Sequence, residues 1–325
     1  MTITEPITSL ETVVPGGLAT ARMLTGRRYH SLSFETWLQV PPTEQKPSPA
    51  LQLAPAEEVI DYIRNAVDAK DIRNLTCKRI RQINAANRHA DPGHVVTQHL
   101  AEPWQEGYDA QVATAWSLYN NNNFTVYIKL KPQPAGTIVV IKGLQTYDTY
   151  VSQRYIGAPD ASGQRTNPLI GAIKRSIPYN QAVAEARAAG TTYPWETLFP
   201  VIRQLAVTYG LSSGKNSIDG KDIGKSISRI WFFKTQDDAT AANALGEVKI
   251  MADTVQIFMA TRSEAKALLD RYGITLADEV PFLVCFDLNG DTEWMRARGS
   301  MLYDMTSPVG QSLDVVVEHL TNGFA

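Results

Sequence analysis

The first 56 residues constrain the fold of this chain most, because they hold seven of its 18 prolines. Proline fixes φ and lacks a backbone N–H, so such a segment stays extended and cannot donate hydrogen bonds to a β-ladder. The apolar side chains between the prolines still need burial, and residues 31–40 alternate apolar and polar groups as a half-buried strand does. We therefore expect residues 1–56 to form an extended arm that lies on its own domain or on a neighbouring subunit.

The overall composition is that of an ordinary globular protein. Of 325 residues, 44% are hydrophobic and 20% are charged, and the net charge is −2. These values allow one large domain or two modest ones and give no global attraction to nucleic acid or to an anionic membrane. Cys77 and Cys285 lie far apart and are expected to be buried, reduced thiols. With no signal-peptide pattern and no apolar run near the ~20 residues that span a bilayer, we expect a cytoplasmic or virion protein with no secretion signal and no membrane partner.

Hydrophobic periodicity predicts several helices. Apolar residues recur at helical spacing over 57–69, 71–86, 106–119, 180–189, 194–209 and 310–322. A capping box, with Thr261 at the N-cap and Glu264 three residues later, opens a further helix that Gly273 closes. Residues 211–226 are expected to be a solvated loop rich in glycine, serine and lysine.

Alternating apolar residues predict strands. Residues 124–131 and 138–141 flank a turn rich in proline and glycine and are expected to pair as a hairpin. Further strands are expected over 229–233, 247–259 and 282–288. The apolar parity shifts near Asp253, which predicts a bulge or turn there. The dipeptide at 289–290, Asn-Gly, is a strong signal for a hairpin turn.

These elements predict an α+β fold: a mixed two-layer body of sheet and helix, with an extended proline-rich N-terminal arm and a projecting β-hairpin. Changes in composition divide the chain into four segments. They are the arm (1–56), a helical segment plus the hairpin (57–142), an irregular excursion followed by helices (143–227), and an α+β sandwich unit (228–325).

Two glycine-rich motifs resemble chemical sites but depart from the required pattern. Residues 210–214 match a nucleophile elbow around Ser212, which needs a strand before the serine and a helix after it. Here a helical pattern precedes Ser212 and a polar loop follows it. Residues 220–226 are one residue too short for a phosphate loop and precede a predicted strand instead of a helix.

Two candidate metal motifs are equally imperfect. His89, His94 and His99 recur every five residues, which does not place imidazoles on one helix face. Residues 287–291 place glycine fourth, where a calcium loop needs it sixth. We therefore predict no catalytic residue, no metal and no cofactor.

The architecture predicts a non-enzymatic, self-assembling structural protein of the kind that forms a viral or phage shell, sheath or filament. Extended segments and hairpins cover much neighbouring surface per residue, so the expected partner is a second copy of the chain. The candidate assembly residues are apolar and aromatic side chains of the arm and the hairpin: Leu32, Phe34, Trp37, Leu38, Phe124 and Tyr127.

Two alternatives remain open. The first is a nucleic-acid-binding subunit that coats RNA, because residues 228–288 can follow the element order of sheet-based RNA readers, with Trp231, Phe232 and Phe233 as stacking candidates. Its phosphate contacts would come from local basic clusters: Arg27, Arg28, Lys78, Arg79, Arg81, Lys215, Lys221 and Lys225. The second alternative is a hydrolase that uses Ser212.

Overall fold

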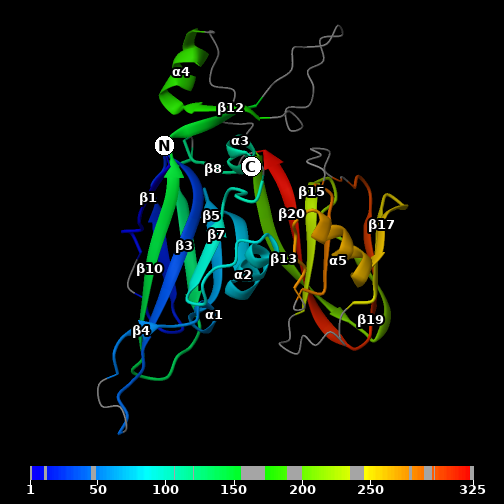
Figure 1. The fold of residues 1–325 in the computed structure, drawn as a ribbon, viewed down its shortest axis with the longest axis horizontal. Helices are drawn as coiled ribbons and strands as arrows, with labels where there is room; N and C mark the ends of the chain where they lie inside the picture. The colour runs from blue at the N-terminus through cyan, green and yellow to red at the C-terminus, as the bar shows by residue number, and fades with distance from the viewer. Residues whose placement is uncertain are drawn as a thin grey trace. The chain divides into compact units, whose positions relative to one another are not determined.

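The computed structural model is dominated by β-strands that form two compact units (Figure 1). The residues it describes are 2–10, 13–44, 49–105, 107–119, 121–154, 173–188, 200–234, 245–277, 280–288, 295 and 297–322. Unit 1 comprises Met1–Asn84, Asp91–Val201 and Asn322–Ala325, and unit 2 comprises Ala85–Ala90 and Ile202–Thr321. The boundary near residue 201 falls inside the segment 143–227 of the sequence-based division.

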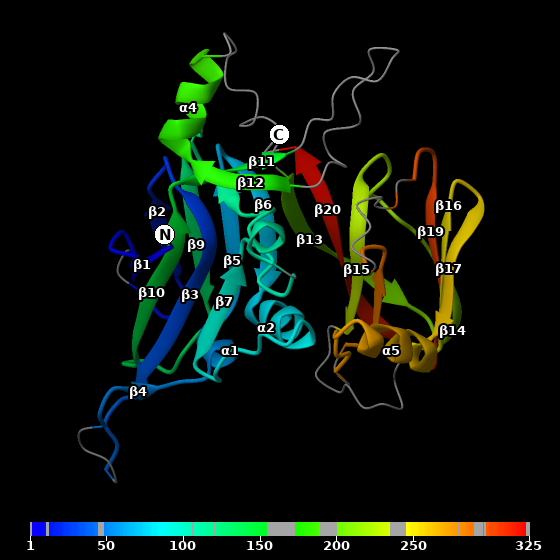
Figure 2. The same cartoon turned by 45° about the horizontal axis from the view of Figure 1, so that its top comes forward.

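Unit 2 is a sandwich of two antiparallel sheets. In chain order its strands are β13 (Pro200–Leu211), β14 (Gly214–Asp219), β15 (Ser226–Lys234), β16 (Glu247–Ala252), β17 (Val255–Thr261), β18 (Phe282–Cys285), β19 (Met301–Ser307) and β20 (Gln311–Asn322). One sheet has the order β18-β15-β20-β13, and the other has the order β14-β19-β16-β17 (Figure 2).

The pairing in unit 2 follows one rule. The first strand pairs with the last, the second with the next to last, the third with β18, and β16 with β17. The strands of unit 2 thus pair as one long hairpin. This hairpin is rolled into two sheets, because β15 also pairs with β20 and β16 also pairs with β19. This topology is the jelly roll, a fold that closes a sandwich with few free edges.

Unit 1 repeats this rule. Its strands are β1 (Ile3–Pro6), β2 (Leu18–Met23), β3 (Arg28–Gln39), β4 (Gln52–Leu53), β5 (Ile60–Val67), β6 (Lys70–Thr76), β7 (Val95–His99), β8 (Trp116–Ser117), β9 (Phe124–Leu130) and β10 (Ile138–Asp148). The pairs of the long hairpin are β1–β10, β2–β9, β3–β7 and β5–β6. The further strand pairs β3–β10 and β5–β9 roll this hairpin into two sheets. The short strands β4 and β8 add to β3.

Helices are short and lie between the strands. They are α1 (Ala56–Val59), α2 (Cys77–Ala86), α3 (Tyr108–Gln111), α4 (Tyr179–Ala188) and α5 (Arg262–Arg271). In each unit a helix follows the fifth strand of the jelly roll: α2 begins directly after β6, and α5 directly after β17. After β10, a two-stranded sheet of β11 (Tyr150–Arg154) and β12 (Ile173–Pro178) leads into α4.

Each core lies between the two sheets of its unit. In unit 1 the rings of Tyr29 and Trp116 lie 5.4 Å and 5.5 Å from that of Phe124, which belongs to the opposite sheet. In unit 2 Phe232 packs edge-to-face against Tyr303 at 5.8 Å. These side chains are fully or almost fully buried, so aromatic edge-to-face contacts join the sheets across the interior.

The predicted α+β fold is wrong, because both units are β-sandwiches. Residues predicted as helices over 57–69 and 310–322 lie mainly in β5 and β20, and the described part of 194–209, from Pro200 on, lies in β13. The start of 71–86 is β6, and only its second half is helical. β5 and β20 are buried on both faces along much of their length, so their apolar residues do not alternate as in a half-exposed strand.

The predicted arm and projecting hairpin are also corrected. Residues 1–56 are not an extended arm on the surface of a domain, because they contribute β1 to β4, which are paired strands of unit 1 itself. Pro6 stands at the end of β1 and Pro55 directly before α1. The strands over 124–130 and 138–148 do not pair with each other, because β9 and β10 belong to opposite sheets. The lysine-rich segment 211–226 contains β14. The predicted turn at 289–290 lies outside the described residues.

Two local predictions are confirmed. Thr261 and Glu264 form a reciprocal capping box at the start of α5, and Gly273 has φ 76° just beyond its end. The parity shift near Asp253 is a two-residue turn between β16 and β17, in which Asp253 and Thr254 have φ of 51° and 69°. Both signals depend on a few adjacent residues, which explains why they can be interpreted without the fold.

The same turn recurs in unit 1, between β5 and β6. There Asp68 and Ala69 have φ of 47° and 66°. The Asp68 carboxylate accepts hydrogen bonds from the backbone N–H groups of Asn122 and Asn123, both at 3.0 Å, just before β9. Asp253 likewise accepts from the backbone N–H groups of residues 298–300, just before β19. Equivalent aspartates therefore hold equivalent loops in the two units.

Removing the Asp253 clamp should destabilise unit 2 in a pH-dependent way. The three backbone N–H donors hold the pKa of Asp253 below its ordinary value of 3.8. Its contribution to stability is therefore present above the ordinary carboxyl pKa and is lost as pH falls through the lowered folded value. We expect Asp253→Ala to lower the thermal unfolding midpoint at neutral pH, with the difference from the parent shrinking below pH 3.8.

The matched control is Asp270→Ala, which removes an exposed carboxylate from α5. It should change the unfolding midpoint less than Asp253→Ala at neutral pH, when both are followed by circular dichroism. Equal midpoints for the parent and Asp253→Ala would contradict the clamp.

Candidate functional site

The candidate assembly residues divide between the core and the surface of unit 1. Leu32, Phe34 and Phe124 are fully buried and pack the interior of the sandwich. Leu38 is half-buried, and it lies opposite Val139 of β10, which is almost fully buried. Trp37 and Tyr127 are half-buried as well and present part of their side chains to the surface.

Trp37 belongs to a group of apolar side chains on the outer face of its sheet. It lies opposite Val140 of β10 on one side and Leu53 of β4 on the other. Ile138, two residues before Val140, points from the same face and is 53% exposed, while Leu53 is 45% exposed. The Lys142 ammonium lies 4.6 Å from the Trp37 ring centroid, within cation–π range. We call Trp37, Leu53, Ile138 and Val140 the Trp37 patch.

Arg28 of β3 is part of a buried ionic cluster. Its guanidinium donates two hydrogen bonds to Asp148 of β10, at 2.9 Å and 2.6 Å, and both side chains are almost fully buried. His30 Nε2 lies 2.9 Å from the same carboxylate, and the Tyr108 hydroxyl donates to it at 3.1 Å. Burial alone would raise the pKa of Asp148, but the hydrogen bonds from His30 and Arg28 and the charge of Arg28 outweigh it and lower that pKa.

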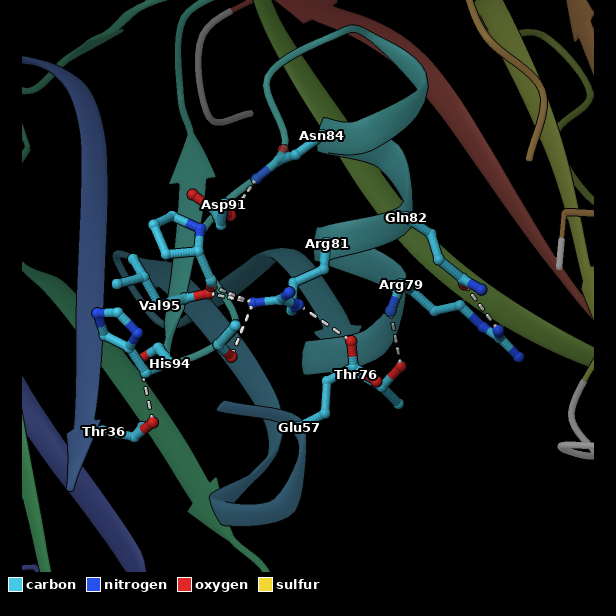
Figure 3. Close-up of polar contacts among 12 residues, drawn as sticks. Thr36, Glu57, Thr76, Arg79, Arg81, Gln82, Asn84, Asp91, His94 and Val95 are labelled. Atoms are coloured by element: carbon cyan, nitrogen blue, oxygen red, sulfur yellow. Dashed lines mark hydrogen bonds and ion pairs between the residues drawn. The ribbon is translucent and has the colours of Figure 1, made fainter. Parts of the chain in front are cut away.

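Arg81 of α2 also serves the fold (Figure 3). Its Nη1 donates to the carbonyl oxygens of Pro92, Gly93 and Val95 at 2.7, 3.1 and 2.6 Å, and its Nε lies 3.0 Å from Glu57 Oε1. One guanidinium therefore ties the loop before β7 and the helix α1 to α2.

The neighbouring cations of α2 are constrained too. Arg79 is 5% exposed and donates to Gln82 Oε1 at 3.0 Å (Figure 3), and Lys78 is half-buried. Elsewhere in unit 1, Arg27 pairs with Glu5 at 2.6 Å and lies 3.9 Å above the Tyr147 ring. The basic side chains of unit 1 therefore make most of their polar contacts with other residues of the same unit.

The lysines of unit 2 are more exposed. Lys215 and Lys221 are exposed, and Lys225 pairs with Asp222 at 2.7 Å. The aromatic stacking candidates Trp231, Phe232 and Phe233 are all fully buried in β15. The element order expected for an RNA reader is absent from the described part of 228–288, because β15 and β16 lie in different sheets.

The near-motifs at Ser212 and at the three histidines do not form sites in the described structure, and most of the calcium-like motif 287–291 lies outside the described residues. Ser212 lies in an exposed turn between β13 and β14, not between a strand and a helix. Its backbone N–H donates to Asn216 Oδ1 at 2.8 Å. Among the described residues, no group of three or more histidine, cysteine, aspartate or glutamate side chains could hold a metal ion. His99 instead packs edge-on against Trp104, at 5.9 Å.

One exposed group was missed by the sequence analysis. Val255, Ile257 and Met259 of β17 are 62%, 36% and 51% exposed. The alternation of apolar residues over 255–259 indicated a strand, but it did not indicate that this strand is at a sheet edge where these three side chains are exposed. The signal that could have revealed it is the absence of any charged residue from Val255 to Thr261.

No helix in the described parts of the chain is long and apolar enough to cross a membrane.

Comparisons with known proteins connect this architecture to viral coats. Residues 49–146 match the family model of the viral coat protein P2 N-terminal domain. No curated protein sequence matches the chain significantly. The matched residues run from before β4 to within β10, which is most of the unit 1 jelly roll.

Solved structures match over nearly the whole chain. The major capsid protein P2 from bacteriophage PM2 aligns with a TM-score of 0.68 at 13% identity and covers 98% of this chain and 97% of its own. The major capsid protein of Sulfolobus turreted icosahedral virus gives 0.65 at 10% identity, with 100% and 98% covered. The capsid of the virus PBCV-1 gives 0.59 at 11% identity, with 98% and 93% covered.

These findings confirm the predicted class of protein. The coat-protein match identifies a structural, non-enzymatic protein of the viral capsid, and the solved structures show that its tandem jelly rolls are a fold of major capsid proteins. The alternative hypothesis, that the chain is a hydrolase that uses Ser212, is therefore rejected. The coat-protein match supports a place in the virion.

Arg28 should matter for folding. Arg28→Met leaves the Asp148 carboxylate buried without its main charge partner, and removing one member of a buried pair typically costs about 3–5 kcal/mol. We expect a loss of this size in the free energy of unfolding, measured by denaturant titration at neutral pH.

The double variant Arg28→Met/Asp148→Asn is the matched control. It removes both charges, so it should recover part of the lost stability. A single variant as stable as the parent would show that the pair does not stabilise unit 1.

Proposed function

We propose that this chain is the repeating subunit of a viral shell and that it assembles with copies of itself. The observation that carries the proposal is the complete pairing rule of the jelly roll in both units, joined to a coat-protein match within unit 1. The P2 protein with which the chain aligns over 98% of its length is named as a major capsid protein.

The Trp37 patch is our candidate for one contact between subunits. Its side chains project from a rigid sheet, and removing apolar surface from water contributes about 25 cal/mol per Å². Leu53 and Ile138 are about half exposed in the isolated chain, so a neighbour that covers them gains this contribution. Lys142 beside Trp37 adds a charge at the rim of the patch.

Tyr127 supports a second, smaller candidate contact. It is half-buried on β9, and the Arg64 guanidinium lies 4.1 Å from its ring centroid. A flat cation stacked on an aromatic ring is typical of groups that anchor protein interfaces. We propose it only as an accessory to the Trp37 patch.

Self-assembly is tested directly by light scattering and negative-stain electron microscopy across a range of concentrations. We expect the parent chain to form discrete oligomers or shells. A parent chain that stays monomeric at every concentration would contradict the proposed function.

A charge in the Trp37 patch should weaken assembly without unfolding the chain. Because Ile138 points outward, Ile138→Glu should leave the unfolding midpoint unchanged and raise the concentration needed for assembly about tenfold, which corresponds to about 1.4 kcal/mol. The control is Leu24→Glu, which places the same charge at a 59% exposed leucine before the other end of β3. If both variants assemble like the parent, the patch is not a contact.

A further inference from the structure

Two buried amide side chains in unit 1 lack a hydrogen-bond partner within the described protein. Asn65 of β5 is 0% exposed, and Gln98 of β7 is 2% exposed. Neither the amide nitrogen nor the amide oxygen of either side chain hydrogen-bonds to a described residue. Native proteins pair nearly all of their buried polar groups, because a buried group without a partner destabilises the fold. These four atoms therefore require a partner from outside the chain.

Strand register places Asn65 inside the sandwich. It lies opposite Val126 of β9, which is fully buried. Ile63 and Val67, two residues to either side along β5, are fully buried as well. Side chains two apart in a strand lie on the same face of the sheet, so the amide of Asn65 points into the interior of unit 1.

Gln98 points into the same interior from the other sheet. It lies opposite Leu32 of β3, and Val96, two residues earlier, lies opposite Phe34. Leu32, Phe34 and Val96 are all fully buried. β7 and β3 belong to one sheet of unit 1, whereas β5 belongs to the other. The two amides thus enter one core from opposite sides.

Arg73 of β6 connects the two positions. It lies directly opposite Asn65 in the β5–β6 pair, so both side chains lie on the interior face, and it is 6% exposed. Its Nη1 donates to the carbonyl oxygen of His99, the residue after Gln98. One side chain therefore reaches from the neighbour of Asn65 to the neighbour of Gln98, which places both amides in the same region of the interior.

We propose that unit 1 contains an internal water site between Asn65 and Gln98, in which bound water hydrogen-bonds to both amides and joins the two sheets. The chemistry of the amides selects this ligand. Each amide offers an acceptor oxygen and N–H donors, so the ligand must both donate and accept. An anion leaves the two oxygens unpaired, and a metal cation leaves the two nitrogens unpaired. Water is small and neutral and satisfies both kinds of group.

The site adds a polar contact to a core that is otherwise joined by aromatic rings. Tyr29 and Trp116 contact Phe124 across the two sheets, and the amides cross the same interior nearer to β6 and β7. A buried water typically makes about three hydrogen bonds and is held as part of the structure. It links two side chains nearly as well as a direct hydrogen bond does. The inference concerns the folded chain alone, so its test is independent of the shell function.

A crystal structure of the parent chain, at a resolution that shows ordered water, tests the site directly. We expect at least one ordered water within about 2.7–3.2 Å of an amide atom of Asn65. The same water, or a second one bonded to it, should lie equally close to an amide atom of Gln98. Amides that hydrogen-bond directly to each other, with no water between them, would contradict the proposal.

Variants that remove the polar atoms test whether the two amides share the water. Asn65→Leu and Gln98→Met replace each amide by an apolar group of similar size. Each single variant deprives the water of a partner and should lower the thermal unfolding midpoint. The double variant removes both amides, so its loss should be smaller than the sum of the two single losses. Strictly additive losses would show that the amides do not share a ligand.

Magnetic relaxation dispersion of the water oxygen reports long-lived internal water in solution. The double variant Asn65→Leu/Gln98→Met should lose part of the signal of the parent, because an apolar site stays dry. The matched control is Thr125→Val, which removes a buried hydroxyl that already donates to Asn123 Oδ1 at 3.0 Å, and it should keep the signal. An undiminished signal in the double variant would overturn the proposal. If that variant does not fold, the crystal structure of the parent decides.

Discussion

Backbone pairing between strands far apart in the sequence is the constraint on which both units depend. Ile3 lies opposite Tyr147 in unit 1, and in unit 2 the first strand, β13, pairs with the last, β20. Once the two ends of a unit are paired, every strand between them must find its partner in the same nested order. Prolines such as Pro6 can then stand at strand ends, where the missing N–H breaks no ladder.

This nesting explains why the fold class could not be predicted from local patterns. In β5, Ile60, Ile63 and Val67 are buried at spacings of three and four, which imitates a helix. Both faces of that strand are covered, so the alternation that marks a half-exposed strand is lost. The pairing partners that decide between the two interpretations are distant in sequence, and a single window of residues does not contain them.

The parts that could be predicted are those decided by a few adjacent residues. The capping box at Thr261 and the turn at Asp253 are such cases. The candidate assembly residues were chosen by apolar character, which does not separate the core from the surface. Leu32 therefore packs inside, while Trp37, on the same strand, lies half-exposed on the outer face. The alternation within β3 separates these two positions, because Leu32 and Trp37 differ in parity and so lie on opposite faces of the sheet.

Charge has a different use inside the fold and at its edges. Arg28 and Arg81 stabilise unit 1, because Arg28 pairs with the buried carboxylate of Asp148 and Arg81 binds carbonyl oxygens around the start of β7. At the edges charge opposes further pairing, as Lys215 does on β14. A coat protein needs stable subunits and at least one surface open to neighbours. The other edge of that sheet, β17, carries no charge, but a shift in its register with β16 at Ile257 interrupts the strand and opposes further pairing in a different way.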